Sequence, residues 1–204
     1  MDDLVERWRE AVRALGGAHG PGDLVARYAE PHRRYHNADH VLAVARDVDV
    51  LALADHRTAR ERAVLALAAL AHDVVYDGVP GEDERRSADW ARARLAGLPE
   101  ADAVADLVLA TADHASDDPL TCLLLDADLA ILGSDPAGYE RYRRAVRAEY
   151  AHVPDDAWRT GRARVLRSLA GRDPLYAGPH ARARWEERAR ANLAAELSSL
   201  GDPP

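Results

Sequence analysis

The sequence of 204 residues contains no phenylalanine and no lysine, and it has a single cysteine, Cys122. One cysteine excludes an intramolecular disulfide, so an apolar core must hold the fold together. No apolar run approaches the roughly 20 residues that span a bilayer. The first residues, MDDLVERW, lack the basic and apolar regions of a signal peptide. These absences predict a cytoplasmic protein with no membrane-spanning segment.

All 27 basic residues are arginine, and they are scattered over most of the expected helices. We attribute this bias to a GC-rich genome and not to function. The formal net charge of -8 argues against a nucleic-acid scaffold, which would carry a basic stripe. A small anionic substrate stays compatible with this charge, because a metal ion and a few arginines can dominate the local field.

Alanine and leucine supply much of the hydrophobic fraction of 48%, and aromatic residues only 5% of the chain. Both residues favour helix, and helical periodicity dominates, without a convincing alternating strand. The length fits one domain or two small ones, and no linker or internal repeat divides the chain. We therefore expect an all-α, single-domain bundle of about eight to ten helices over residues 1–204, with a core at about 24–170 and terminal helices packed on it. The expected helices cover about residues 2–15, 23–30, 38–54, 59–75, 84–95, 101–114, 120–132, 136–151, 155–169 and 181–200.

Two histidines, His36 and His40, lie one helical turn apart and can share a face. Asn37 is a suitable N-cap, which would place His36 at the mouth of a helix and His40 inside it. Taken alone, this pair is as compatible with two surface histidines as with a metal site.

The dyad His72-Asp73 follows the run Ala63–Ala71, which offers only apolar side chains. An ionisable pair there must be hydrogen-bonded, paired or metal-bound to offset its desolvation. Neighbouring helical residues point about 100° apart, so both can reach one ion only near a helix end or bend. The alternative is a histidine at the helix C-terminus beside a solvated aspartate. It explains less well why two titratable groups end an otherwise apolar helix.

A second apolar helix is interrupted by Asp126 and Asp128. Asp128 shares a face with Leu124 and Ile131 and should point toward the core, whereas Asp126 lies on a different flank. A carboxylate on the buried face is paired with arginine or bound to metal, and the histidines above favour metal.

Together these residues predict a divalent metal site with four ligands, His40, His72, Asp73 and Asp128. Mixed nitrogen and oxygen ligands suit Mn, Fe, Co, Ni or Zn better than calcium. Magnesium stays a candidate, as does a second ion.

At these residues the sequence resembles the HD superfamily of metal-dependent phosphohydrolases, whose signature is a His, a His-Asp dyad and a distant Asp on a helical bundle. His40, His72-Asp73 and Asp128 match this order. The segment 35–40 also resembles the motif that opens the catalytic domain of cyclic-nucleotide phosphodiesterases. In that family the first histidine is a general acid and the second is a metal ligand.

A group of bacterial predicted HD phosphohydrolases is a closer match. Its motifs PHRxYHNxxH, HDxVYD, an EERSA-like segment and DADLAILG resemble residues 31–40, 72–77, 84–88 and 126–133 of this chain. The chain departs from that group at Asp83, which stands where an Asn is usual. The resemblance implies an all-helical metal hydrolase and names no substrate.

The mechanism that we expect is hydrolysis of a small phosphorylated substrate by a metal-activated water. His36 would be the catalytic proton donor to the leaving oxygen, and Asp73 would be both ligand and catalytic residue. At least one of Arg33 and Arg34 would hold the phosphate, the other being a solvated surface arginine.

Further candidates for substrate or second-ion contacts are His114, Asp77, Glu84 and Asp126. His114 is equally compatible with a core histidine bonded to a backbone carbonyl. Acids that border a loop, as Asp77 and Glu84 do, are more often simply solvated than bound to an ion.

Two rival functions remain open. Some relatives of the HD superfamily are di-iron oxygenases. They need additional histidine ligands between the dyad and the last Asp, and His114 is the one candidate here. A non-catalytic nucleotide-binding protein is the other rival. A homodimer formed through terminal helices that expose Trp185 and Leu193 is a further expectation.

Overall fold

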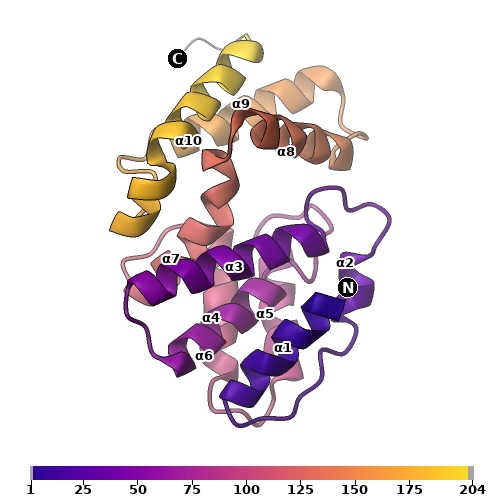
Figure 1. The fold of residues 1–204 in the computed structure, drawn as a ribbon. Helices are drawn as coiled ribbons and strands as arrows, with labels where there is room; N and C mark the ends of the chain where they lie inside the picture. Colours follow the sequence, from indigo (N-terminus) through magenta and orange to yellow (C-terminus); the bar gives the residue numbers. More distant parts are fainter. Residues whose placement is uncertain (1, 202–204) are drawn as a thin grey trace. The chain divides into compact units, whose positions relative to one another are not determined.

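The computed structural model describes residues 2–201, which form ten α-helices, two short 3-10 segments and no strand (Figure 1). This confirms the prediction of an all-α bundle of eight to ten helices. The chain divides into two compact units, which we call unit 1, ending at Asp128, and unit 2, beginning at Leu129. A single domain over residues 1–204 stays a prediction.

Unit 1 contains seven of the α-helices and one 3-10 segment, η1. Their bounds follow the expected ranges closely at most ends. They are α1 (Asp2–Ala14), α2 (Leu24–Tyr28), α3 (Ala38–Ala54), α4 (Ala59–Ala71), α5 (Glu82–Arg94), α6 (Ala101–Leu109), η1 (Ala110–Ala112) and α7 (Pro119–Asp128).

The centre of unit 1 is α4, the helix that contains the apolar run Ala63–Ala71. Thr58 caps its N-terminus in a capping box with Glu61. Leu65, Leu67 and Leu70 are fully buried, and each stabilises the fold by about 1.5–3 kcal/mol relative to an exposed position. Helices α1, α3, α5, α6 and α7 all pack against α4. The residues that follow α4 are therefore held at the interior of unit 1.

The end of α4 differs from the expected boundary at about residue 75, because the α-helix stops at Ala71. His72 is its C-cap, and Val74 closes a turn by donating its N–H to the Ala71 carbonyl. The next amide, that of Val75, donates to Ser87 Oγ on α5. Beyond the dyad, Ser87 of α5 thus replaces an intrahelical partner for the Val75 amide. This is the helix end that the dyad needs if both side chains are to face one ion.

The start of α3 confirms the predicted N-cap. The Asn37 side chain accepts hydrogen bonds from the amides of Asp39, at 2.9 Å, and His40, at 3.4 Å. The helix consequently begins at Ala38, with His36 just before it and His40 in its first turn. The cap fixes the direction in which His40 enters the core.

Unit 2 contains η2 (Leu129–Gly133), α8 (Pro136–Glu149), α9 (Asp155–Ala170) and α10 (Pro179–Ser199). At Gly133 a Cβ atom would lie 2.4 Å from the Cβ of Trp185, so this close approach of η2 to α10 requires glycine. The expectation that Trp185 and Leu193 are exposed is wrong. They are only 6% and 1% exposed because η2 and α10 pack on each other. The homodimer itself stays a prediction.

A buried polar network crosses unit 2. Arg162 donates from Nε and Nη2 to the two carboxylate oxygens of Glu196, at 2.9 and 3.1 Å. Tyr139 donates its hydroxyl to the same carboxylate at 2.7 Å. The network ties α8, α9 and α10 together around one carboxylate.

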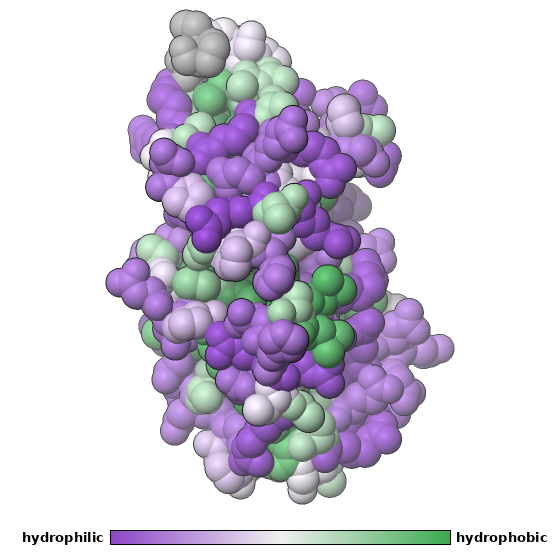
Figure 2. All heavy atoms as spheres, turned by 60° about the vertical axis from the view of Figure 1, so that its left-hand side comes forward, coloured by the Kyte–Doolittle hydropathy of each residue, from purple (hydrophilic) through white to green (hydrophobic). Residues whose placement is uncertain are grey.

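The face of the molecule seen in Figure 2 is covered mainly by hydrophilic residues, with small hydrophobic patches. Among the described helices, none is both long and apolar enough to cross a membrane.

Candidate metal centre

The four predicted ligands come from three segments of unit 1. His40 lies in the first turn of α3, His72 and Asp73 directly after α4, and Asp128 at the end of α7. The two histidines are buried, with exposed fractions of 7% and 2%. The Asp73 and Asp128 side chains are 17% and 12% exposed. Buried imidazoles thus face carboxylates that retain some access to solvent.

The ligand atoms of His40, His72 and Asp128 lie in one group, and Asp73 lies beside the two histidines. His40 Nε2 lies 3.3 Å from His72 Nε2. Asp73 Oδ2 lies 3.4 Å from the first of these nitrogens and 3.1 Å from the second. Asp128 Oδ1 lies 3.2 and 3.3 Å from the same two atoms. One oxygen of each carboxylate, Asp73 Oδ2 and Asp128 Oδ1, is therefore close to both ring nitrogens.

These distances fit a shared ion. Two ligand atoms about 2.0–2.2 Å from one metal, at angles of about 90–110°, lie about 2.8–3.6 Å apart. His40, His72 and Asp128 form a group of ligand atoms that could hold a metal ion, and the Asp73 oxygen meets both nitrogens at similar separations. Two carboxylates and two imidazoles also supply the charge and the donor types that a divalent transition metal prefers.

The orientation of His72 supports this reading. Its Nδ1 lies 2.9 Å from the Ala69 carbonyl oxygen, which can only accept a hydrogen bond, so Nδ1 carries the proton. In the neutral ring the lone pair then lies on Nε2, the atom that faces His40 and the carboxylates. A backbone carbonyl behind a ligating histidine is the usual means of fixing its tautomer.

The electrostatics of the cluster follow from its composition. Burial alone lowers the pKa of His72, but the charges and hydrogen bonds of Asp73 and Asp128 outweigh it and hold the pKa well above its usual value. The pKa of His40 is also raised, although burial opposes the shift, because the same carboxylates accept its hydrogen bonds. Burial raises the pKa of both carboxyls, yet the neighbouring histidines hold them well below their usual range. Both carboxylates are therefore ionised at neutral pH.

His114 reaches the same centre from η1's C-terminal side. Its Nε2 lies 2.8 Å from Asp128 Oδ2, the oxygen that does not face His40 and His72. Its backbone has φ of +47°, in the left-handed region that non-glycine residues seldom adopt. The contact with Asp128 is a side-chain contact, unlike the backbone partner that one sequence interpretation gave to His114.

His36 lies beside the cluster, in an aromatic group. Its ring stacks on Tyr76 with centroids 4.0 Å apart and lies 5.6 Å from the His40 ring. Tyr35 packs against both histidines, 4.9 Å from the ring of His36 and 4.7 Å from that of His40. His36 is thus held beside the His40 ring and outside the group of ligand atoms.

The two candidate phosphate-binding arginines differ in environment. Arg34 is exposed, whereas the Arg33 side chain has no exposed surface. Arg33 is bonded to protein groups on all sides. A phosphate contact by either residue stays a prediction.

The remaining candidates have other partners. Asp77 pairs with Arg86 at 2.6 Å, and Glu84 accepts from the Gly81 amide at 2.6 Å as part of the start of α5. Asp126 is buried, with 3% exposure. Their assignment to substrate or second-ion binding stays a prediction.

Sequence reasoning missed the role of Asp83 and the stacking of Tyr76 on His36. Asp83 Oδ2 accepts from the amides of Asp77 and Val79, both at 2.9 Å, and so shapes the loop that follows the dyad. Turn rules do not predict this contact, because they concern Asp and Asn side chains that bond the backbone two residues further on. The position of Tyr76 depends on contacts between distant segments, which periodicity does not report.

The comparisons with known proteins add no further constraint. No family model, no curated protein and no solved structure matched the chain. The functional argument therefore depends on the geometry of the centre and on the sequence motifs.

Proposed function

We propose that the chain is a metal-dependent phosphohydrolase of the HD type. The observation that carries the proposal is the position of Asp73 and Asp128, whose oxygens each lie 3.1–3.4 Å from both His40 Nε2 and His72 Nε2. The order of these residues along the chain is that of the HD signature. Desolvating two carboxylates and two imidazoles is costly, so their retention beside one another supports a bound ion.

Each residue has a separate task in this proposal. His40, His72, Asp73 and Asp128 hold a divalent ion, which supplies Lewis-acid activation of a water and of a phosphoryl oxygen when bound. His114 fixes the outer oxygen of Asp128. His36 donates a proton to the leaving oxygen, a task that histidine performs more often than any other side chain.

The substrate that we propose is a nucleotide or another small phosphorylated metabolite. The net charge of -8 disfavours a polyanionic scaffold, whereas one phosphate group can be held by the ion and the exposed Arg34. A cytoplasmic location is part of this proposal.

A metal analysis coupled to a phosphoester screen tests the function. Protein loaded with Mn, Co or Zn would be assayed against p-nitrophenyl phosphates, nucleotides and sugar phosphates, beside Asp73→Asn. We expect metal-dependent turnover by the wild type and a loss of at least about 100-fold in the variant. Turnover unaffected by chelator, or equal turnover by the variant, would contradict the proposal. Oxygen uptake by iron-loaded protein without phosphoester turnover would favour the oxygenase instead.

A further inference from the structure

The guanidinium of Arg33 lies at the junction of two segments that carry the metal centre. Its side chain has no exposed surface. Nη1 donates to the His36 carbonyl at 3.0 Å and to the Asp73 carbonyl at 2.6 Å. Nη2 donates to the Val74 carbonyl at 3.0 Å. One planar group thus joins the turn before α3 to the turn after α4.

The carbonyls that Arg33 binds belong to residues of the proposed reaction. His36 is the proposed proton donor, and Asp73 is a proposed ligand. Because the same nitrogen, Nη1, contacts both carbonyls, the separation of these two backbone positions is set by one atom. Arginine is suited to this task because its donors form a rigid fork.

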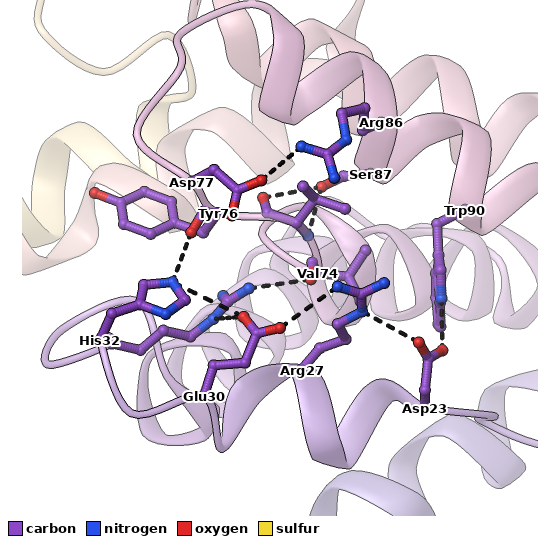
Figure 3. Close-up of polar contacts among 12 residues, drawn as sticks. Asp23, Arg27, Glu30, His32, Val74, Tyr76, Asp77, Arg86, Ser87 and Trp90 are labelled. Atoms are coloured by element: carbon purple, nitrogen blue, oxygen red, sulfur yellow. Dashed lines mark hydrogen bonds and ion pairs between the residues drawn. The ribbon is translucent and has the colours of Figure 1, made fainter.

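The surroundings hold the guanidinium in place. Nε donates to Glu30 Oε2 at 3.0 Å, and the group lies over the rings of Tyr28 and Tyr76, 5.2 and 5.8 Å from their centroids. Figure 3 shows Glu30, Val74 and Tyr76, three of the residues that contact the Arg33 guanidinium. His32 Nε2 also contacts the Tyr76 carbonyl at 2.8 Å (Figure 3).

Tyr76 connects this packing to the proton donor. One ring contacts the Arg33 guanidinium and stacks on the His36 imidazole. Arg33 therefore reaches His36 by two routes, through its backbone carbonyl and through the ring that stacks on its side chain.

We propose that Arg33 is a positioning residue, which fixes the segment bearing His36 and His40 relative to the dyad His72-Asp73. This inference rests on the proposed function and gives Arg33 a role other than phosphate binding. Substrate would not contact Arg33, since its side chain has no exposed surface and four of its five N–H groups bond Glu30 and three backbone carbonyls. Without the Arg33 hydrogen bonds, the segment that bears His36 and His40 would shift relative to the dyad, and the metal centre would lose its geometry.

The test compares two buried arginines, each replaced by lysine. Arg33→Lys retains the charge but cannot span the same carbonyls. Arg162→Lys is the matched control, because Arg162 is also buried but belongs to the network of Glu196 and Tyr142 in unit 2. The measurements are the thermal midpoint, the Kd for Co(II) and the visible spectrum of the Co(II) protein.

We expect both variants to lower the thermal midpoint. Only Arg33→Lys should raise the Kd for Co(II), by about 10- to 100-fold, and shift the Co(II) bands. In Arg162→Lys the Kd should stay within about twofold of the wild type. A wild-type Kd and spectrum in Arg33→Lys would overturn the proposal, as would equal changes in Arg162→Lys.

Two additions keep the test decisive. If Arg33→Lys does not fold, Glu30→Gln is the second variant, because it weakens the contact of Glu30 with the Arg33 guanidinium more mildly. It should change the Kd for Co(II) and the Co(II) spectrum in the same direction. A Kd and a spectrum that both stay unchanged in Glu30→Gln would overturn the proposal. If the wild type turns over a phosphoester, kcat should fall in Arg33→Lys with KM within about threefold, whereas a phosphate ligand would raise KM. Absence of turnover would count against the proposed function alone, because the Co(II) comparison still tests Arg33.

Discussion

Nε2 of His114 lies 2.8 Å from Oδ2 of Asp128, while the other oxygen of that carboxylate faces the two buried histidines. The two oxygens of Asp128 therefore have different tasks. One is directed at the proposed ion, and the other is held by a side chain from a different segment. A carboxylate that is held in this way loses less rotational freedom when it binds a metal.

Replacing His114 should accordingly weaken metal binding without abolishing it. We expect His114→Asn to raise the Kd for Mn(II) or Co(II) by about 10- to 100-fold. Asparagine tolerates the left-handed backbone at this position, so the change isolates the lost contact. Isothermal titration measures the effect, with His180→Ala as the exposed control. Wild-type affinity in His114→Asn would show that Asp128 needs no such support.

Removing a proposed ligand should have a larger effect. Asp73→Asn retains the shape of the side chain but removes a charge from between His40 and His72. We expect loss of stoichiometric metal in the purified protein and of metal-dependent turnover, measured by elemental analysis and by the phosphoester assay. Asp89→Asn, on the exposed side of α5, is the control. Full metal content in Asp73→Asn would remove this residue from the ligand set.

Metal affinity should depend on pH in a defined direction. The carboxylates raise the pKa of His40 and His72 above the ordinary value, despite the burial that lowers it. Both imidazoles therefore retain protons to higher pH in the metal-free protein, and an ion must displace them. We expect affinity to increase by about tenfold or more per pH unit between pH 6 and 8.

The release of protons on metal binding is an independent test of this pH dependence. Titrations in buffers of different ionisation enthalpy should show net release of protons on metal binding at pH 7. A binding enthalpy that is independent of the buffer would mean that the ion does not compete with protons at these histidines.

The proton donor can be separated from the ligands. His36→Gln should bind metal as tightly as the wild type within about threefold, because its ring lies beside the cluster and not in it. Its kcat should fall by about 10²- to 10⁴-fold. A p-nitrophenyl ester, whose leaving group needs little protonation, should show a smaller loss than an alkyl ester. Equal losses for both esters would contradict the assignment of His36 as the acid.

Unit 2 makes a separate prediction about stability. Burial raises the pKa of Glu196, but Arg162 and Tyr139 outweigh it and lower the pKa below the usual value of 4.5. The stabilisation is therefore present above about pH 4.5 and is lost as the pH falls through the lowered pKa. We expect Glu196→Gln to reduce the free energy of unfolding by about 3–5 kcal/mol at pH 7.

Urea unfolding at several pH values measures this difference, which should shrink below about pH 4.5. Glu140→Gln, whose partner side chains are partly exposed, should cost no more than about 1 kcal/mol. A deficit in Glu196→Gln that stays constant down to pH 3 would mean that the charge of Glu196 is not the source of the stabilisation.

Much of this site was open to prediction because local rules determine it. The Asn37 cap and the 3.6-residue period place His40 and Asp128 on inward faces. The requirement for a helix end at the dyad followed from the 100° between neighbouring side chains, although the end itself lies at Ala71, earlier than periodicity suggested. Apolar residues such as Val74 and Val75 continue a helical pattern whether or not the backbone does.

Other features of the site and the fold depend on contacts between segments that are far apart in the sequence. Local sequence patterns do not predict such contacts. Arg33 and Arg34 are chemically identical neighbours, and contacts such as those with the Asp73 and Val74 carbonyls distinguish the buried one from the exposed one. The burial of Trp185 follows from the close approach of Gly133. The contact between His114 and Asp128 joins two segments that are 14 residues apart, and helical periodicity does not report it.

The most direct test of the account is an anomalous diffraction map of the protein crystallised with Zn or Mn. The account predicts one strong peak about 2.0–2.3 Å from His40 Nε2, His72 Nε2, Asp73 Oδ2 and Asp128 Oδ1. A map with no peak between these four atoms, or with the ion bound elsewhere on the chain, would contradict it.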